Sequence, residues 1–309
     1  MTEVLPASDA AIAKAAQLIL AGHPVAVPTE TVYGLAADAT NGEAVARIYA
    51  AKGRPGFNPL IVHVRNFAQA QEIGIFSEQA QALAETYWPG PLTLVVPLRP
   101  EAGIADAVTA GLGTVALRCP KHPVMQALLA ATGRPLAAPS ANASGTISPT
   151  SAAHVLKTLG GRIPLVLDGG PGEVGLESTI IRATDGKLLL LRPGPIDLGT
   201  AVGPPQSATR IEAPGQLRSH YAPTKPLRLD VTRADAGEWL IGFGAISGDY
   251  NLSSSGDLDE AAVRLFAALH RADGEAAPRI AVAPIPRFGT GLAINDRLCR
   301  AAAPRTSQE

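Results

Sequence analysis

The sequence predicts an α/β protein of two units: an N-terminal unit with an open mixed sheet, and a small C-terminal Rossmann-like unit. The chain has 309 residues, more than the roughly 100–200 of a typical domain. In the first 200 residues, helix and strand patterns lack the regular alternation of a doubly wound parallel sheet. After residue 226, strands and helices alternate regularly. The change of pattern separates the two units.

Helical spacing and β-branched runs locate the N-terminal elements. Asp9 is expected to cap a helix to about residue 21, with Ile12, Ala16 and Ile19 on one side. The stretch 41–51 has the same spacing, and 60–64 is a β-branched apolar run typical of a strand. The other expected elements are strand 25–27, a helix from Ser77 to before Trp88, strands 92–98 and 114–118, helix 122–131, strand 136–138, helix 151–159, strand 164–168, and a hairpin of 178–182 with 187–192 around a turn at 184–186.

Proline marks the boundary between the units. Residues 201–226 contain Pro204, Pro205, Pro214, Pro223 and Pro226 and few apolar runs, which predicts a linker between units 1–200 and 227–309. No GxGxxG follows the first strand of the second unit, so that unit need not bind a nucleotide. Its expected elements are strands 227–231, 239–243 and 280–283 and helices 257–270 and 291–302.

Composition argues against several classes of protein. A net charge of −1 and 4% aromatic residues disfavour a nucleic-acid-binding surface. Cys119 and Cys299 form no CxxC pair, and the histidines show no metal-ligand spacing, so no zinc ribbon, disulfide framework or protein metal site is expected. No run approaches the ~20 apolar residues of a membrane span. The acidic N-terminus lacks a signal-peptide pattern. We therefore expect a cytoplasmic protein without a membrane partner.

Two polar loops flank the helical stretch 41–51, at 29–34 and 52–59. The second carries Lys52, Arg54 and Asn58 among two glycines and two prolines. Proline restricts the loop to one shape, and the arginine fork suits phosphate or carboxylate. This pattern favours an anion site. On spacing alone, a surface hairpin with two solvated cations is an equally good interpretation.

Four separated motifs resemble one known family. They are PTETVYGL at 28–35, KGRPxxNPLIVH at 52–63, SANASG at 140–145 and ESTI at 177–180, in that order. The sequence is similar to YrdC-like threonylcarbamoyl-adenylate synthases of the long, two-domain form, strongly over the first two thirds of the chain. The resemblance implies a YrdC-like open twisted mixed sheet with helices around a concave cavity, followed by a Rossmann-like C-terminal domain.

The resemblance also implies a reaction. The family joins L-threonine, bicarbonate and ATP into threonylcarbamoyl-AMP and pyrophosphate, and other proteins transfer the product to tRNA to form N6-threonylcarbamoyladenosine beside the anticodon. Mg²⁺ would be carried by the phosphates. Negative charge accumulates in this chemistry, so cations and aimed donors should dominate catalysis. Stable tRNA binding is not expected.

The same resemblance assigns residues to roles. Lys52, Arg54, Ser140 and Asn142 would be catalytic. Ser140 and Asn142 alternate along a segment that we expect to be extended, so both side chains should face one side. Threonine would be bound by Thr31, His63, Arg118, Ser140 and Ser178. ATP would be bound by Arg54, Asn58, Thr114, Asn142, Thr150, Arg192 and Tyr221.

Some of these residues also have an ordinary structural interpretation. His63 can be a hydrogen-bonded core histidine, Arg192 can end a hairpin, and 140–145 can be a polar turn. Glu177 and Asp168 are further candidates to support cations.

The linker carries one more match. Residues 213–223 resemble the family pattern SPGMKYxHYxP, with Leu217 where a lysine is usual and Arg218 beside it. At ~3.3 Å per residue this segment can cross a cavity, so it is a candidate lid with Tyr221 on ATP. The alternative is a passive tether.

Two other functions remain open on sequence grounds. One is an RNA-binding module without catalysis. The other is a carbamoyl-transfer enzyme of hydrogenase maturation, a family with a similar domain. Its Cys-rich zinc motifs and acylphosphatase-like region are missing here.

Overall fold

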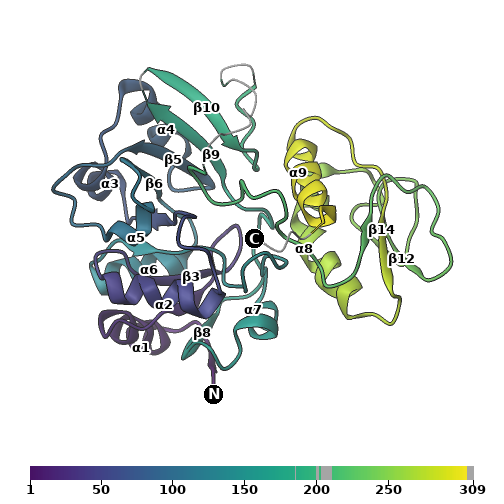
Figure 1. Ribbon diagram of the computed structural model, residues 1–309, viewed down its shortest axis with the longest axis horizontal. Coiled ribbons are helices and arrows are strands. Elements are labelled where there is room, and N and C mark those ends of the chain that lie inside the picture. The colour runs from purple at the N-terminus through teal and green to yellow at the C-terminus, as the bar shows by residue number, and fades with distance from the viewer. Residues whose placement is uncertain (185, 200–201, 203–210, 305–309) are drawn as a thin grey trace.

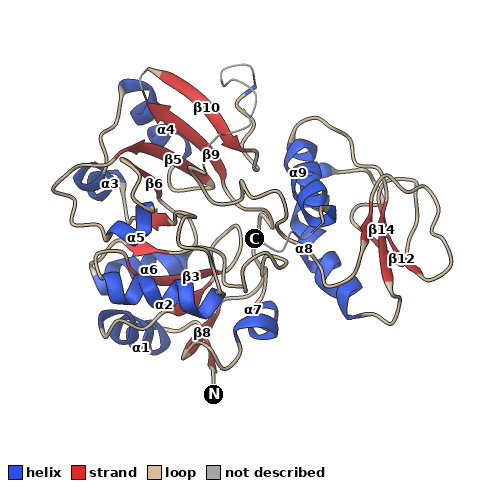
Figure 2. Cartoon of the chain, in the orientation of Figure 1, coloured by secondary structure: helices blue, strands red, loops and turns tan. Residues whose placement is uncertain are grey.

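A computed structural model describes residues 1–184, 186–199, 202 and 211–304. Among these residues, a ten-stranded and a four-stranded sheet form the centres of two units (Figures 1 and 2). Asp185 of the predicted turn and much of the predicted linker, at 201 and 203–210, lie outside the described residues. No helix in the described part of the chain has the length and apolar character that crossing a bilayer requires.

The large sheet is mixed, as predicted. Its order is β1-β8-β2-β3-β7-β4-β6-β5-β9-β10, with parallel pairs such as β4–β6 beside antiparallel ones such as β5–β6. The strands are β1 Glu3–Pro6, β2 Val25–Val27, β3 Gly34–Asp38, β4 Ile61–His63, β5 Leu92–Pro97, β6 Thr114–Arg118, β7 Leu136–Ala137, β8 Leu165–Asp168, β9 Thr179–Thr184 and β10 Lys187–Arg192.

The helices of this unit pack around the sheet and include two that the sequence pattern missed, α3 and α5. Ser8, not Asp9, caps α1, because the Ser8 side chain accepts from the Ala11 amide. The helices are α1 Asp9–Leu20, α2 Gly42–Lys52, α3 Phe67–Ile73, α4 Glu78–Tyr87, α5 Asp106–Thr109, α6 Pro123–Thr132 and α7 Ala152–Leu159.

Helix α2 begins and ends where its sequence signals indicate. The Asn41 side chain accepts from the amides of Glu43 and Ala44, and Gly53 ends the helix in the left-handed conformation at φ 59°. The sharp exit at Gly53 keeps Lys52 on the last helical turn and lets Arg54 turn inward, so both side chains are buried.

The C-terminal unit is a parallel sheet in the order β11-β14-β12-β13, which confirms a small Rossmann-like α/β unit. In Figure 1, α8 and α9 lie between this sheet and the N-terminal unit. The elements are β11 Leu227–Arg228, β12 Glu238–Gly242, β13 Tyr250–Asn251, α8 Leu258–Gly274, β14 Arg279–Val282 and α9 Thr290–Ala302.

Helix α8 contacts the N-terminal unit at close range. Gly175 has φ 74°, and a Cβ there would lie 2.5 Å from Cα of Val263 and 2.6 Å from the Ala262 carbonyl oxygen. The His270 ring stacks on His154 of α7, with centroids 3.9 Å apart. The two units are thus in contact through the backbone of Gly175 against α8 and through the stacked His154 and His270 rings.

Gly175→Ala should weaken this junction. The substitution combines left-handed strain of about 1–3 kcal/mol with a collision against helix backbone that cannot move aside. Gly161→Ala is the matched control, because Gly161 has φ 79° and open space around its Cβ position. Thermal unfolding should show a clearly larger fall in Tm for Gly175→Ala. Equal falls would mean that α8 does not pack tightly on Gly175.

Candidate active site

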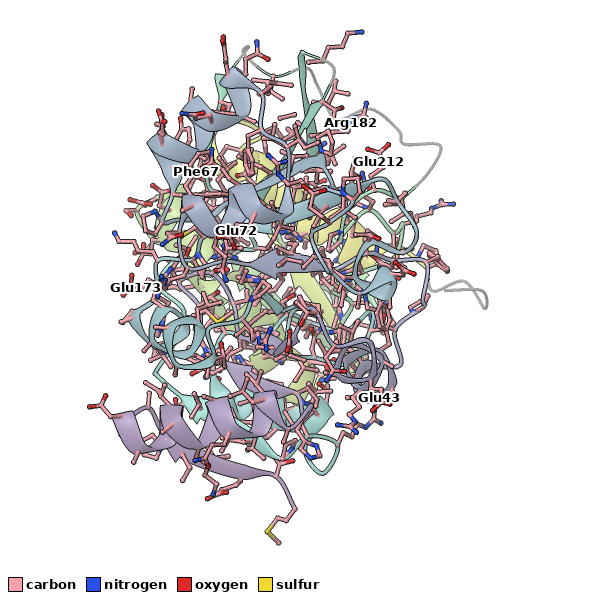
Figure 3. All side chains as sticks on the ribbon, turned by 90° about the vertical axis from the view of Figure 1, so that its left-hand side faces the viewer. Glu43, Phe67, Glu72, Glu173, Arg182 and Glu212 are labelled. Carbon is pink, nitrogen blue, oxygen red and sulfur yellow. The ribbon has the colours of Figure 1, made fainter. Side chains whose placement is uncertain are left out.

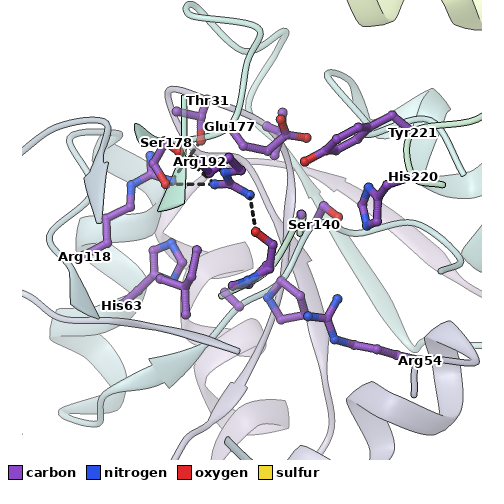
Figure 4. A pocket seen from close by; sticks show the side chains of 16 residues that line it. Thr31, Arg54, His63, Arg118, Ser140, Glu177, Ser178, Arg192, His220 and Tyr221 are labelled. Atoms are coloured by element: carbon purple, nitrogen blue, oxygen red, sulfur yellow. Dashed lines mark hydrogen bonds between the residues drawn. The ribbon is translucent and has the colours of Figure 1, made fainter. Parts of the chain in front are cut away.

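A buried pocket forms at the carboxyl ends of β4 and β6. These strands are parallel, and His63 and Arg118 are register partners at their ends. Figure 4 shows His63 and Arg118 on one side of the pocket and His220 and Tyr221 on the opposite side. The lining residues are Thr31, Val32, Arg54, Ile61, His63, Arg118, Ala138, Pro139, Ser140, Glu177, Ser178, Arg192, Pro214, Gly215, His220 and Tyr221.

Lys52 and Arg54 are held by oxygens without a carboxylate among their hydrogen-bond acceptors. The Lys52 ammonium donates to the backbone carbonyls of Ser140, at 2.6 Å, and Asn142. The Arg54 guanidinium donates to the Asn58 carbonyl and side-chain oxygens, at 3.1 and 2.7 Å, and to the Pro59 carbonyl at 2.8 Å. Burial lowers the pKa of both groups. Arg54 adds to the effect on Lys52, and Arg192 adds to the effect on Arg54, whose pKa falls to about 10.

Arg118, at the end of β6, lines the pocket and has a carboxylate partner. It forms a 2.8 Å ion pair with Glu30 and donates to the Thr31 hydroxyl at 3.0 Å. Burial opposes ionisation of Glu30, but Arg118 outweighs it and holds the Glu30 pKa below its ordinary value. Glu30 therefore orients Arg118 toward the pocket.

Arg192 ends β10 and turns back onto the start of β9. Its guanidinium donates to the Ser178 carbonyl at 2.9 Å and to the Ser178 hydroxyl at 3.2 Å. The hydroxyls of Ser178 and Thr93 lie 2.7 Å apart. Two neighbouring strands thus hold Ser178 and Arg192 in the lining.

The described part of the predicted linker forms one wall of the pocket through Pro214, Gly215, His220 and Tyr221. Its start is tied to β9, because Arg182 donates to both carboxylate oxygens of Glu212 at 2.7 Å; Figure 3 shows the two side chains together.

Its far end is also tied to the N-terminal unit. The Ala222 amide donates to the Gly145 carbonyl at 2.9 Å. This wall is anchored at both ends to the N-terminal unit, which disfavours a passive tether.

Apart from the ion-paired Arg118, three lining groups present buried polar atoms without hydrogen-bond partners in the described structure: Nδ1 of His63, Nδ1 of His220 and the Tyr221 hydroxyl. Burial, then Arg118, lowers the His63 pKa to about 3. Burial, then Arg54 and Lys52, holds the His220 pKa well below its ordinary value. Both rings are therefore neutral near pH 7. Buried unpaired polar atoms usually mark a position that a ligand or water completes.

The structure places the predicted site residues at three levels. Eight line the pocket: Thr31, Arg54, His63, Arg118, Ser140, Ser178, Arg192 and Tyr221. Lys52 and Asn58 lie behind the lining, where Lys52 holds the Ser140 backbone and Asn58 holds Arg54. Thr150 lies against His154 on the α7 side, 3.2 Å from its Nδ1, and Thr114 begins β6 at the end opposite Arg118.

The expectation of an extended 140–142 segment is wrong. The Asn142 amide donates to the Ser140 carbonyl at 3.0 Å, so the chain turns at this point. The Asn142 side chain points to Thr146, donating to its carbonyl at 2.8 Å, while Asn142 Oδ1 has no partner among the described residues. The Lys52 ammonium stabilises this turn, because it donates to the carbonyls of both Ser140 and Asn142.

The sequence pattern assigned no role to Glu30, His220 or Arg297, and only a weak one to Glu177. Glu30 lies inside the first motif and His220 inside the linker match, so their positions in motifs were a usable signal for these two residues. Arg297 lies far from every motif, yet it is fully buried and forms a 2.8 Å ion pair with Glu177. No local pattern indicates that contact.

The lining can hold an anion beside a small polar ligand. It contains three guanidinium groups and one carboxylate. Arg118 is paired with Glu30, and the Glu177 carboxylate with Arg297, which leaves Arg54 and Arg192 without a carboxylate partner among the described residues. The excess positive charge suits phosphate or carboxylate, while the neutral rings and hydroxyls suit hydrogen bonding to an uncharged or zwitterionic group.

Both units of the chain are similar to known proteins. Residues 17–194 match the Sua5/YciO/YrdC family model described as "Telomere recombination", and residues 187–303 match the model of the threonylcarbamoyl-AMP synthase C-terminal domain. The chain is 41% identical to the threonylcarbamoyl-AMP synthase of Bacillus subtilis over 99% of this chain and 96% of the relative. It is 38% identical to that of Pyrococcus abyssi over 94% of each.

A solved structure resembles the whole chain. The crystal structure of P. abyssi Sua5 complexed with L-threonine superposes with a TM-score of 0.89 at 36% identity, covering 97% of this chain and 98% of the other. Motifs, fold and full-length similarity lead to the same conclusion: the chain belongs to the threonylcarbamoyl-AMP synthase family, in its long form with a C-terminal domain.

Proposed function

We propose that this chain is an L-threonylcarbamoyladenylate synthase that converts L-threonine, bicarbonate and ATP into threonylcarbamoyl-AMP and pyrophosphate. The observation that carries the proposal is the buried pocket in which Arg54, Arg118 and Arg192 converge with neutral hydrogen-bonding groups. A nucleotidyltransferase needs such a cluster, because negative charge develops on the α-phosphate and on the leaving pyrophosphate.

Threonine would occupy the side of the pocket formed by β4 and β6. Arg118 would face its carboxylate, and Thr31, His63, Ser140 and Ser178 would hold its polar groups. The neutral His63 ring adds no charge beside the amine, which must lose its proton to attack bicarbonate. The Glu30–Arg118 pair would fix the threonine in one orientation, which lowers the entropic cost of reaction.

The nucleotide would occupy the opposite side. The carbamate oxygen must attack the α-phosphate in line with the leaving pyrophosphate. Arg54 and Arg192 would bind the phosphates, with Lys52 setting the Ser140–Asn142 turn and Asn58 orienting Arg54. Tyr221 completes the part of the proposed ATP site that lines the pocket. The assignments of Asn142, Thr150 and Thr114 stay predictions from the resemblance, because none of the three is in the lining.

Mg²⁺ would reach this site with ATP. Glu177 is the carboxylate of the lining, and it is engaged by Arg297 and by the Ser148 hydroxyl. The phosphates would therefore supply most of the oxygen ligands, and the metal would neutralise their charge.

We further propose that the enzyme is cytoplasmic and that separate proteins transfer its product to tRNA. Its proposed parts are a catalytic domain at residues 1–200, a linker at 201–226 and a C-terminal domain at 227–309.

Pyrophosphate release tests the function directly. The purified chain with ATP and Mg²⁺ should release pyrophosphate only when L-threonine and bicarbonate are both present, because the carbamate is the nucleophile. Release at the same rate without threonine would identify a different ATPase. Salt-sensitive tRNA binding without any release would instead support the RNA-binding alternative.

Arg54→Ala should abolish most turnover without unfolding the protein. Removing one aimed donor to the phosphates is expected to lower kcat by at least about 100-fold. Arg134→Ala is the control, because Arg134 is exposed and makes only a long 4.0 Å ion pair with Asp38. Steady-state pyrophosphate release and a thermal unfolding curve provide the measurements. Normal kinetics in Arg54→Ala would remove Arg54 from the site.

Tyr221→Ala tests whether the 211–226 wall acts as a lid. The variant should bind ATP more weakly and should release a shorter-lived product, because water would reach the labile mixed anhydride. Equilibrium binding of ATP and the decay rate of threonylcarbamoyl-AMP on the enzyme measure the two effects. If both are unchanged, the wall is static and the lid hypothesis fails.

A further inference from the structure

Arg297, on α9 of the C-terminal unit, is fully buried and reaches the catalytic pocket. Its guanidinium donates to the Glu177 carboxylate at 2.8 Å and to the Pro193 carbonyl at 2.8 Å. Its plane lies over the Tyr221 ring, 5.3 Å from the centroid. On its own helix it pairs with Asp296 at 2.9 Å.

Each of these contacts ends on a different part of the pocket. Glu177 precedes Ser178 at the start of β9, Pro193 follows Arg192 at the end of β10, and Tyr221 belongs to the 211–226 wall. The first two lie at the ends of the paired strands of one hairpin, and the third lies in the wall, so one side chain joins the hairpin to the wall. A lysine could supply the charge but not this planar fork, because its ammonium is a single point donor.

The surrounding contacts support this position of α9. The Glu177 carboxylate also accepts from the Ser148 hydroxyl, and His270 of α8 contacts the Ser148 carbonyl at 3.1 Å. Arg300, one turn beyond Arg297, donates to the Leu217 carbonyl of the wall. The C-terminal unit therefore contacts the wall and the Glu177 loop through several side chains, with Arg297 at their centre.

We propose that Arg297 is a positioning residue for the adenylation step. Through it, the C-terminal domain would hold pocket residues of the N-terminal unit in place. Arg297 sets the places of Glu177, Arg192 and Tyr221 relative to one another without touching substrate itself. The inference rests on the proposed function, since the step it supports is attack on the α-phosphate.

The test compares the full-length wild type with Arg297→Met, Arg297→Lys and the control Arg271→Met. Arg271 is an exposed residue of α8 that pairs with Glu275 at 3.6 Å and lies over the Tyr250 ring, 5.6 Å from its centroid, away from the pocket lining. The measurements are thermal unfolding, and kcat and KM of threonine-dependent pyrophosphate release. Arg297→Met should lower kcat about 100-fold, as expected for a small displacement of reacting groups.

The KM for threonine should stay unchanged in Arg297→Met. Arg118 keeps its ion pair with Glu30, and Ser178 keeps its hydrogen bond to Thr93 of β5, so the threonine side does not depend on Arg297. Arg297→Lys should have the Tm of the wild type, because the charge opposite Glu177 remains. Its kcat should stay as low as that of Arg297→Met. Arg271→Met should match the wild type in kcat and KM, because Arg271 does not line the pocket.

Several outcomes would overturn the inference. Wild-type kcat in a folded Arg297→Met would do so, as would full recovery of kcat by lysine, which would show that charge alone suffices. A parallel rise in the KM for threonine would indicate general loosening of the pocket. If Arg297→Met fails to fold, Arg297→Lys decides alone. Absence of threonine-dependent release by the wild type would refute the proposed function, and this inference with it.

Discussion

Buried cations held by backbone carbonyls are the constraint on which the rest of this structure depends. Lys52 and Arg54 are out of water, and their hydrogen bonds go to the carbonyls of Ser140, Asn142, Asn58 and Pro59 and to one amide side chain. Removing a cation from water without a counter-ion is costly, so the fold must provide these oxygens at fixed positions. Carbonyl dipoles orient the cations but leave their charge available, which is the condition an anionic ligand requires.

The same constraint explains the unusual shapes around the pocket. Gly53 adopts a left-handed conformation so that Lys52 and Arg54 can both turn inward. The 140–142 segment bends so that two carbonyls meet one ammonium. Tyr221 also has a positive φ, of 62°, and its ring closes the wall beside Arg297. The backbone strain of a non-glycine residue at positive φ, as at Tyr221, persists only where surrounding contacts over-determine it, and it often accompanies a functional site.

Much of the fold could be predicted from local pattern. The strand Thr114–Arg118 and the caps Asn41, Ser77 and Ser151 follow from β-branched runs and capping chemistry. The missed elements had weak local signals: β3 reads Gly-Leu-Ala-Ala-Asp, without a β-branched residue, and β13 has two residues. These strands form because a neighbouring strand offers hydrogen bonds, as β2 and β7 do for β3, and periodicity does not report a neighbour.

The sequence by itself determined the chemistry of the site, because motif order and residue type identify the cations and hydroxyls that a nucleotide and an amino acid need. Only the tertiary structure decided how they act together. It placed Lys52 and Asn58 behind the lining, gave Arg118 a carboxylate partner in Glu30, and brought Arg297 from the C-terminal unit to Glu177. The reason is physical: a residue's type limits which bonds it can make, but its partners come from distant parts of the chain, and only folding brings them within hydrogen-bonding distance.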